Sequence, residues 1–184
     1  MNVTGLILAG GLGTRMGGAD KGWVEFEGRS LIESLIAQLQ PQVDKLVISA
    51  NRNLDRYAAL GFPVVTDLRP DHAGPLAGIE TGLSVCETDW LLTCPVDTLN
   101  LPADYAQRMQ QAAPSVAFAG GHLQPVFMLV PRSALASLSA SLDSGNGKVR
   151  HWTDQMGLRQ VSFDDTPGAL CNLNDWQALQ QAQQ

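Results

Sequence analysis

Positive charge is scarce in this sequence. Only 12 of the 184 residues are Lys or Arg, against 18 that are Asp or Glu, so the formal net charge is -6. This balance argues against a broad basic surface that would bind nucleic acid through its phosphates. A polyanionic ligand would therefore need locally concentrated cations or a metal ion.

Long apolar runs are also lacking, since no stretch approaches the ~20 apolar residues that a membrane span requires. At the N-terminus, residues 1–5 lead into a short apolar run at residues 6–9 and then into glycines, which is unlike a secretory signal. We therefore expect a cytoplasmic protein that binds neither nucleic acid nor a membrane.

Cysteine and histidine are few. The three cysteines are widely spaced, with no CxxC pair: Cys86, Cys94 and Cys171. We interpret them as small, mostly buried apolar side chains in a reducing compartment, rather than as a metal site or a disulfide. The three histidines form no recognisable catalytic group: His72, His122 and His151.

Apolar residues, by contrast, make up 45% of the chain, enough for the core of one domain of ordinary size. Short β-branched runs alternate with longer amphipathic stretches, which is typical of a mostly parallel sheet covered by helices on both faces. Strands are predicted at residues 4–8, 45–50, 63–66, 90–94, 115–119, 126–130 and 158–163. Helices are predicted at residues 31–39, 54–60, 76–86, 103–113, 133–142 and 148–156, with a last one after Asn174. The first of them is expected to begin at a capping box of Ser30 and Glu33. The pattern predicts an α/β fold of three layers, α/β/α and Rossmann-like, in a single domain over residues 1–184.

The first predicted strand runs into a glycine-rich segment at residues 8–21. Its five glycines allow the backbone to turn sharply and to present amide donors to phosphate oxygens. Arg15 and Lys21 supply the positive charge that the rest of the chain lacks. The segment therefore predicts a phosphate-binding loop.

Two common phosphate-binding loops do not fit this segment. A dinucleotide-binding GxGxxG motif fails because Met16 stands where the third glycine is needed, and no ribose-binding acid follows the second strand. A Walker loop fails because Lys21 lies between Asp20 and Gly22, without the required glycine before it and Ser or Thr after it.

Instead, the loop resembles the signature of molybdenum cofactor guanylyltransferases in three places: Leu8-Ala9-Gly10-Gly11, Arg15-Met16-Gly17-Gly18 and Asp20-Lys21. Further similar segments follow in order along essentially the whole chain: Asp67, Gly74-Pro75-Leu76-Ala77-Gly78, Cys94-Pro95-Val96-Asp97-Thr98, Gln124-Pro125-Val126-Phe127 and Asn172-Leu173-Asn174. That family transfers GMP from GTP to molybdopterin and releases pyrophosphate. The first signature is shared with relatives that use CTP, UTP or other triphosphates, so the combination is what favours GTP.

The resemblance implies a nucleotidyltransferase fold, Mg²⁺ as cofactor, and GTP and molybdopterin as substrates. A maturation protein of molybdoenzymes is a further partner that it allows. The N-terminal half would bind GTP and the metal, and the C-terminal half would bind the acceptor. The nucleotide-binding residues that it implies are Leu8, Ala9, Gly10, Gly11, Lys21, Ser49, Asp67 and Asp97. Catalytic roles fall to Arg15, Lys21 and Asp97.

Asp97 follows the predicted strand at residues 90–94, at the carboxyl end, where open α/β sheets bind their ligands. A carboxylate that faces a triphosphate usually acts through Mg²⁺, and the resemblance assigns Asp97 this metal role. An Asp that only begins a loop or caps the next helix is the alternative.

Base selectivity is expected to involve Asp67 and Gly11. A carboxylate can accept from two donors of guanine, although contact with ribose is equally allowed, and CTP-using relatives resemble Leu-Ala-Ala-Gly where this chain has Leu-Ala-Gly-Gly. Ser49 stands where the family often has an asparagine. Either Ser49 is a smaller substitute or Asn51, two residues later, supplies part of the contact.

Residues for the acceptor are expected mainly later in the chain: Gly78, Lys148, Arg150, Asn172 and Asn174. Lys148 and Arg150 lie at the predicted start of a helix, where cations are unfavourable unless an anion is near. A solvated turn accounts for them equally well.

Three other functions remain open from the sequence. A CTP-dependent molybdopterin transferase is disfavoured by Gly10-Gly11 and Asp67, and some sugar-phosphate nucleotidyltransferases by the short chain. A nucleotide-binding module without catalysis would not need Arg15, Lys21 and Asp97 together.

Overall fold

The computed structural model describes residues 1–11, 20–69 and 74–173. One mixed sheet of seven strands runs through the molecule in the order β5-β4-β1-β6-β8-β7-β9. The strands are β1 (Val3–Leu8), β4 (Lys45–Ser49), β5 (Val64–Val65), β6 (Trp90–Pro95), β7 (Ser115–Ala119), β8 (His122–Pro131) and β9 (Arg159–Ser162). Only β8 runs antiparallel to its neighbours, β6 and β7. The predicted mostly parallel sheet is therefore confirmed.

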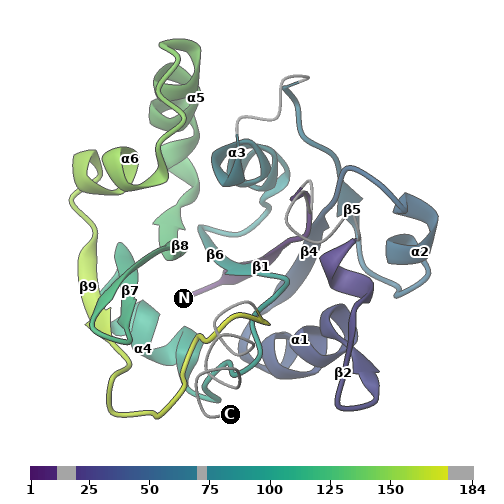
Figure 1. The fold of residues 1–184 in the computed structure, drawn as a ribbon. Coiled ribbons are helices and arrows are strands. Elements are labelled where there is room, and N and C mark those ends of the chain that lie inside the picture. The colour runs from purple at the N-terminus through teal and green to yellow at the C-terminus, as the bar shows by residue number, and fades with distance from the viewer. Residues whose placement is uncertain (12–19, 70–73, 174–184) are drawn as a thin grey trace.

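Helices cover both faces of this sheet (Figure 1). Helices α1 (Leu31–Leu39) and α4 (Tyr105–Gln111) lie on one face, and α3 (Pro75–Val85), α5 (Leu135–Asp143) and α6 (Val149–Gln155) lie on the other. A short helix, α2 (Leu54–Ala58), stands beside the β4–β5 edge. This arrangement confirms the three-layer α/β/α prediction.

Each face has its own apolar core, because alternate residues of a strand point to opposite sides. In β1, Ile7 packs with the α1 and α4 side, whereas Leu6 packs with the α3 and α5 side. Along β8, Leu129 and Met128 divide in the same way. The interior strands are consequently mostly apolar, with a few buried polar residues such as Thr4, Ser49 and Thr93.

All seven predicted strands and the six predicted helices within the described residues are present, with shifted ends. The β8 strand begins four residues before its predicted start, because Gly120 and Gly121, both at positive φ, form a tight hairpin turn directly after β7. The hairpin of β2 (Glu25–Phe26) and β3 (Arg29–Ser30) was not predicted, because strands of two residues give no periodic signal. The capping box of Ser30 and Glu33 is confirmed at the start of α1.

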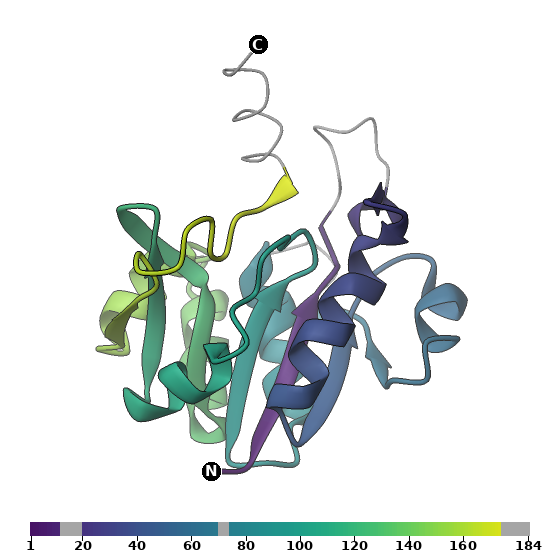
Figure 2. The ribbon, with the colours of Figure 1, turned by 90° about the horizontal axis from the view of Figure 1, so that it is seen from below.

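The parallel strands all end at the same edge, which Figure 2 shows at the top. The segment after β6 and the last described residues meet there: Leu173 N donates to Asp97 O at 3.0 Å, and Leu99 N donates to Cys171 O at 2.8 Å. Residues far apart in the sequence therefore converge at this edge. Among the described helices, none is both long and apolar enough to cross a membrane.

Candidate active site

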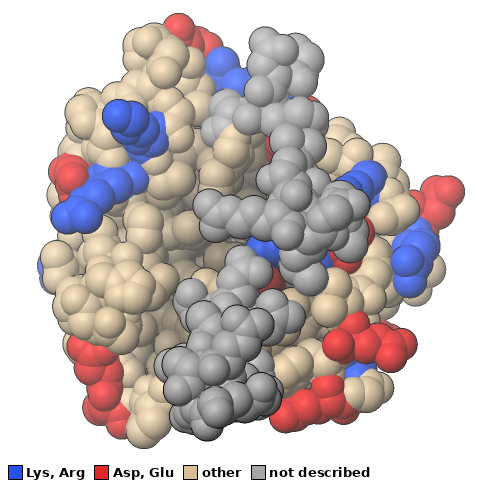
Figure 3. Space-filling model, in the orientation of Figure 1, with Lys and Arg blue, Asp and Glu red and all other residues tan. Residues whose placement is uncertain are grey.

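A cavity of about 390 Å³ opens at the carboxyl edge, between the ends of β1, β4 and β6 and the start of α3. Figure 3 looks onto this edge and shows a hollow near its centre, with Lys, Arg, Asp and Glu mainly toward the periphery. Eight residues predicted for the site line the cavity: Leu8, Gly10, Gly11, Ser49, Asp67, Gly78, Asp97 and Asn172. Ala9 lies beneath it, with its side chain in the core. Two predicted site residues, Arg15 and Asn174, lie outside the described residues, as does His72.

Lys21 does not itself line the cavity, but it forms an ion pair with Asp97, which does. Lys21 Nζ lies 2.7 Å from Asp97 Oδ2, and the two side chains are 24% and 16% exposed. Asp97 is carried by the turn after β6, where Thr98 N donates to Pro95 O at 3.2 Å. The structure thus brings together two residues that are 76 positions apart. Each of them was predicted from the sequence to bind the nucleotide.

The Asp97 carboxylate fits a magnesium site in part. Its Oδ1 accepts no hydrogen bond from the described residues, and no group of three or more His, Cys, Asp or Glu side chains stands together among them. Because Mg²⁺ commonly uses one or two carboxylates together with substrate phosphates, the nucleotide would complete its coordination shell.

Asp20, next to Lys21, is held by α2. Its Oδ1 accepts from the Tyr57 hydroxyl at 2.6 Å and from Gly22 N at 3.2 Å, and its Oδ2 accepts from Asn53 Nδ2 at 2.9 Å. Burial, and then the hydrogen bond to Asp20, raises the pKa of Tyr57 above its ordinary value, so the hydroxyl keeps its proton and donates it.

On the other side of the cavity, Ser49 and Asp67 carry polar atoms without partners. Ser49 Oγ and Asp67 Oδ1 are both buried and make no hydrogen bond with the residues that the structure describes. Such atoms are costly unless a ligand or water satisfies them. They are therefore suited to receive polar atoms of a bound molecule.

Asn51 acts on Asp67 instead of lining the cavity. Its Nδ2 donates to Asp67 Oδ2 at 2.8 Å, and its Oδ1 accepts from Asp67 N at 3.0 Å. Ser49 and Asn51, the two candidates to replace the asparagine of the family, therefore have different places. Ser49 faces the cavity, and Asn51 fixes the orientation of Asp67.

Gly78 lets α3 approach this wall. A Cβ atom at Gly78 would lie 2.9 Å from Ser49 Oγ and from Leu8 Cδ2, closer than real Cβ contacts. At Gly11, in contrast, a Cβ would meet no described atom within 4 Å. Glycine at position 78 therefore gives α3 the room to lie against Leu8 and Ser49, whereas at position 11 no described residue of the protein calls for glycine.

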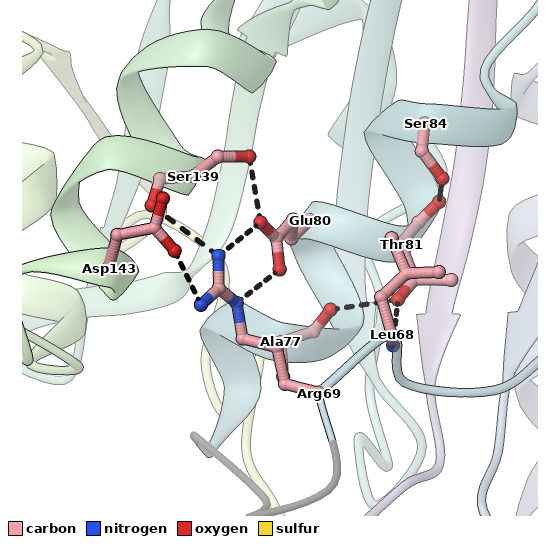
Figure 4. Close-up of polar contacts among 8 residues, drawn as sticks. All are labelled: Leu68, Arg69, Ala77, Glu80, Thr81, Ser84, Ser139 and Asp143. Atoms are coloured by element: carbon pink, nitrogen blue, oxygen red, sulfur yellow. Dashed lines mark hydrogen bonds and ion pairs between the residues drawn. The ribbon is translucent and has the colours of Figure 1, made fainter.

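The segment that carries Asp67 is tied to α3 and α5 by the polar contacts drawn in Figure 4. Arg69 Nε and Nη2 lie 2.7 and 2.8 Å from the two carboxylate oxygens of Glu80, and Arg69 Nη1 lies 2.8 Å from Asp143. Ser139 Oγ donates to Glu80 at 2.7 Å. Hydrogen bonds from Arg69, more than that from Ser139, hold the pKa of Glu80 below its ordinary value. These four residues were not predicted from the sequence, because nothing in their spacing indicates that they form a cluster.

The residues predicted for the acceptor divide into two groups. Gly78 and Asn172 line the cavity together with Gln124, from the Gln124-Pro125-Val126-Phe127 segment, which was not predicted as a site residue. Lys148 and Arg150 are exposed at the start of α6 and do not line it. Their role stays a prediction.

The fold and the cavity define an α/β nucleotidyltransferase, and residues 5–161 match the family model of the MobA-like NTP transferase domain. The chain is 45% identical to the molybdenum cofactor guanylyltransferase of Cupriavidus pinatubonensis over 94% of its own length and 92% of the relative's. The chain therefore belongs to the molybdenum cofactor guanylyltransferase family.

Solved structures share this fold at low sequence identity. Molybdopterin-guanine dinucleotide biosynthesis protein A from Archaeoglobus fulgidus superposes with a TM-score of 0.72 at 20% identity, covering 97% of this chain and 96% of that one. A Mycobacterium tuberculosis protein, Rv0371C, solved in complex with manganese, has a TM-score of 0.70 at 14% identity, with 98% and 97% covered.

Proposed function

We propose that this protein transfers GMP from GTP to molybdopterin, forming molybdopterin guanine dinucleotide and pyrophosphate. The observation that carries the proposal is the cavity in which Gly10, Gly11, Ser49, Asp67 and Asp97 meet, with Lys21 paired to Asp97. The family relationship, at 45% identity over 94% of the chain, supports the same reaction.

In the transfer, a phosphate oxygen of the acceptor attacks the α-phosphorus of GTP in line with the bond to the β-phosphate. That bond breaks and its electron pair leaves with pyrophosphate. A phosphate monoester with its second pKa near ~6 is already largely ionised at neutral pH, so no protein base is required. This agrees with the cavity lining among the described residues, which contains no histidine.

The protein's part is binding and charge compensation. Lys21 would move from Asp97 onto the triphosphate, and Arg15 would act beside it. Asp97 would hold Mg²⁺, which offsets charge on the departing pyrophosphate when bound. The Mycobacterium tuberculosis protein of the same fold was solved with manganese, which supports a divalent cation here.

Guanine would be read by the two unpartnered atoms on the opposite wall, Ser49 Oγ and Asp67 Oδ1. The acceptor would lie toward Asn172 and Gln124, where the cavity adjoins a second one of about 570 Å³ lined by residues of the C-terminal half. This division supports a single domain with GTP bound by its N-terminal half and the acceptor by its C-terminal half.

The test is pyrophosphate release from GTP, CTP, ATP and UTP in turn, with and without molybdopterin, with identification of the dinucleotide by mass. We expect the guanine product, formed only when the acceptor and Mg²⁺ are both present. Equal formation of the cytosine product would contradict the GTP assignment and leave only the nucleotidyltransferase class.

Base selectivity offers a sharper form of this test. A hydrogen bond from guanine to the free Oδ1 of Asp67 would be worth roughly 1.5–3 kcal/mol, so Asp67→Ala should reduce the preference for GTP over CTP by about tenfold or more. Gly11→Ala should reduce it as well, because the added methyl group meets no described atom within 4 Å and would project toward the bound nucleotide. Both variants can be tested in competition assays with mixed GTP and CTP, which measure the ratio of the guanine to the cytosine product. An unchanged ratio in Asp67→Ala would show that Asp67 does not recognise the base.

A further inference from the structure

The carboxylate of Asp20 is buried without touching the cavity. Its side chain is 6% exposed and accepts three hydrogen bonds, from Tyr57, Gly22 and Asn53. Among the described residues, the guanidinium of Arg52 comes nearest, with its Nε 3.9 Å from Asp20 Oδ2. Removing a carboxylate from water is costly unless its oxygens are satisfied, so this cluster holds a charge that the proposed chemistry does not use directly.

The cluster fixes the backbone from which Lys21 extends. Asp20 is the N-cap of the short 3-10 helix at Lys21–Trp23, where Trp23 N donates to Asp20 O at 3.1 Å and Val24 N donates to Lys21 O at 3.1 Å. Lys21 then reaches Asp97 with its Nζ atom 2.7 Å from Oδ2. A lysine side chain has many rotamers, and a fixed backbone reduces the freedom that must be lost when it binds phosphate.

The fit between this helix and Tyr57 is close. Tyr57 is fully buried, its ring lies 5.0 Å from that of Trp23, and its hydroxyl hydrogen bonds to Asp20. A Cβ atom at Gly22 would overlap this hydroxyl. Glycine at position 22 therefore allows Tyr57 to approach the turn that carries Lys21.

From this arrangement we infer that Asp20 and Tyr57 are positioning residues for Lys21, a role that rests on the proposed function of the cavity. They hold the start of the 3-10 helix against α2 so that the Lys21 ammonium stands beside Asp97 before the triphosphate binds. They touch neither substrate nor metal, and they act on the reaction only through Lys21.

The test is Tyr57→Phe, which removes the hydroxyl and keeps the ring. The only other tyrosine, Tyr105, provides a matched control, because it is equally buried and its hydroxyl donates to Thr93 O at 2.9 Å. Loss of a hydrogen bond to a charged group should lower kcat/KM for GTP by about tenfold in Tyr57→Phe, whereas Tyr105→Phe should change it less than about twofold. Melting temperatures of both variants show whether they lose similar stability. Equal losses of activity in the two variants would mean a general stability effect and would overturn the inference.

A double-mutant cycle with Lys21→Ala decides whether the effect passes through Lys21. In the Lys21→Ala background, Tyr57→Phe should cause no further loss of kcat/KM, because the residue that it positions is already gone. A full additional loss would show that Tyr57 acts by another route. Asp20→Asn, which removes the charge and keeps the size, should behave as Tyr57→Phe does in both backgrounds.

Titration of GTP without acceptor separates this inference from the proposed function. If the wild type binds GTP but transfers it to no acceptor, the proposed function fails, and weaker binding by Tyr57→Phe than by Tyr105→Phe still supports the positioning role. Equal binding by the two variants overturns the positioning role alone. A wild type that binds no triphosphate overturns both.

Discussion

Two buried carboxylates stand on opposite faces of the sheet, and they are held by different kinds of partner. Asp20 accepts three hydrogen bonds from neutral groups, with Arg52 no nearer than 3.9 Å. Glu80 forms a bidentate ion pair with Arg69, at 2.7 and 2.8 Å, and accepts a hydrogen bond from Ser139. One cluster adjoins the reacting cation Lys21, and the other ties the segment of Asp67 to two helices.

This difference indicates that the two clusters have different roles. A close ion pair with both carboxylate oxygens engaged neutralises the charge on Glu80 and joins α3 to α5 and to the segment before α3. The Asp20 cluster is linked through one residue to the Lys21–Asp97 pair. Changes near Asp20 and Lys21 should therefore appear in rates, and changes near Glu80 mainly in stability.

The largest effect on the reacting side is expected from Asp97→Asn, which keeps the size of the side chain and removes the charge proposed to hold Mg²⁺. Turnover should fall by roughly 10²–10³-fold while the melting temperature stays near that of the wild type. Steady-state rates over a Mg²⁺ titration measure this. Near-normal turnover at saturating Mg²⁺ would remove Asp97 from the metal role.

Next in size is Lys21→Ala, which removes the cation paired with Asp97. We expect kcat/KM for GTP to fall by about a hundredfold, with a larger loss at low salt, where electrostatic attraction is less screened. Arg15→Ala is expected to act in the same direction. GTP titrations at two salt concentrations provide the measurement, and unchanged affinity in both variants would show that the glycine-rich loop is only a turn.

On the opposite face, Glu80→Gln should lower the free energy of unfolding by about 2 kcal/mol, because Arg69 keeps its charge without its main partner. We expect kcat at saturating GTP to change by less than about threefold, since Glu80 lies away from the reacting groups. Chemical denaturation and kinetics on the same samples test both parts. The double variant Arg69→Leu with Glu80→Leu is the control, since replacing both charges should recover part of the stability. A large loss of kcat with unchanged stability would reverse the comparison.

The smallest effect concerns pH. Arg69 holds the pKa of Glu80 below its ordinary value of 4.5, so the folded state binds the proton less readily than the unfolded state. The stabilisation is therefore complete above pH 4.5 and is lost as pH falls through the lowered pKa of the folded state. The stability difference between the wild type and Glu80→Gln should shrink as pH falls from 7 to below about 4. A difference that is constant over this range would contradict the prediction.

Residues close in sequence account for what could be predicted of the site. The glycines and Lys21 follow β1, and Asp97 follows β6, so the rule that ligands bind at the carboxyl ends of parallel strands was enough to place them at one edge. The family resemblance added Asp67 and Asn172, which line the cavity. Local signals such as the capping box at Ser30 were also reliable, because they depend on residues three positions apart.

The sequence by itself determined the alternation of strands and helices, the glycine-rich loop and the identity of most cavity residues, because periodicity and turn chemistry are local properties. Only the tertiary structure decided that Lys21 pairs with Asp97, that Asn51 orients Asp67, and that Tyr57 anchors Asp20. The tertiary structure also decided that Glu80, on a helix that the sequence predicted, is buried in an ion pair. Nothing in the sequence indicated its partner. These contacts join residues 11 to 76 positions apart, and their energies depend on burial and on distances of a few ångströms, which are set only when the two layers of helices pack on the sheet.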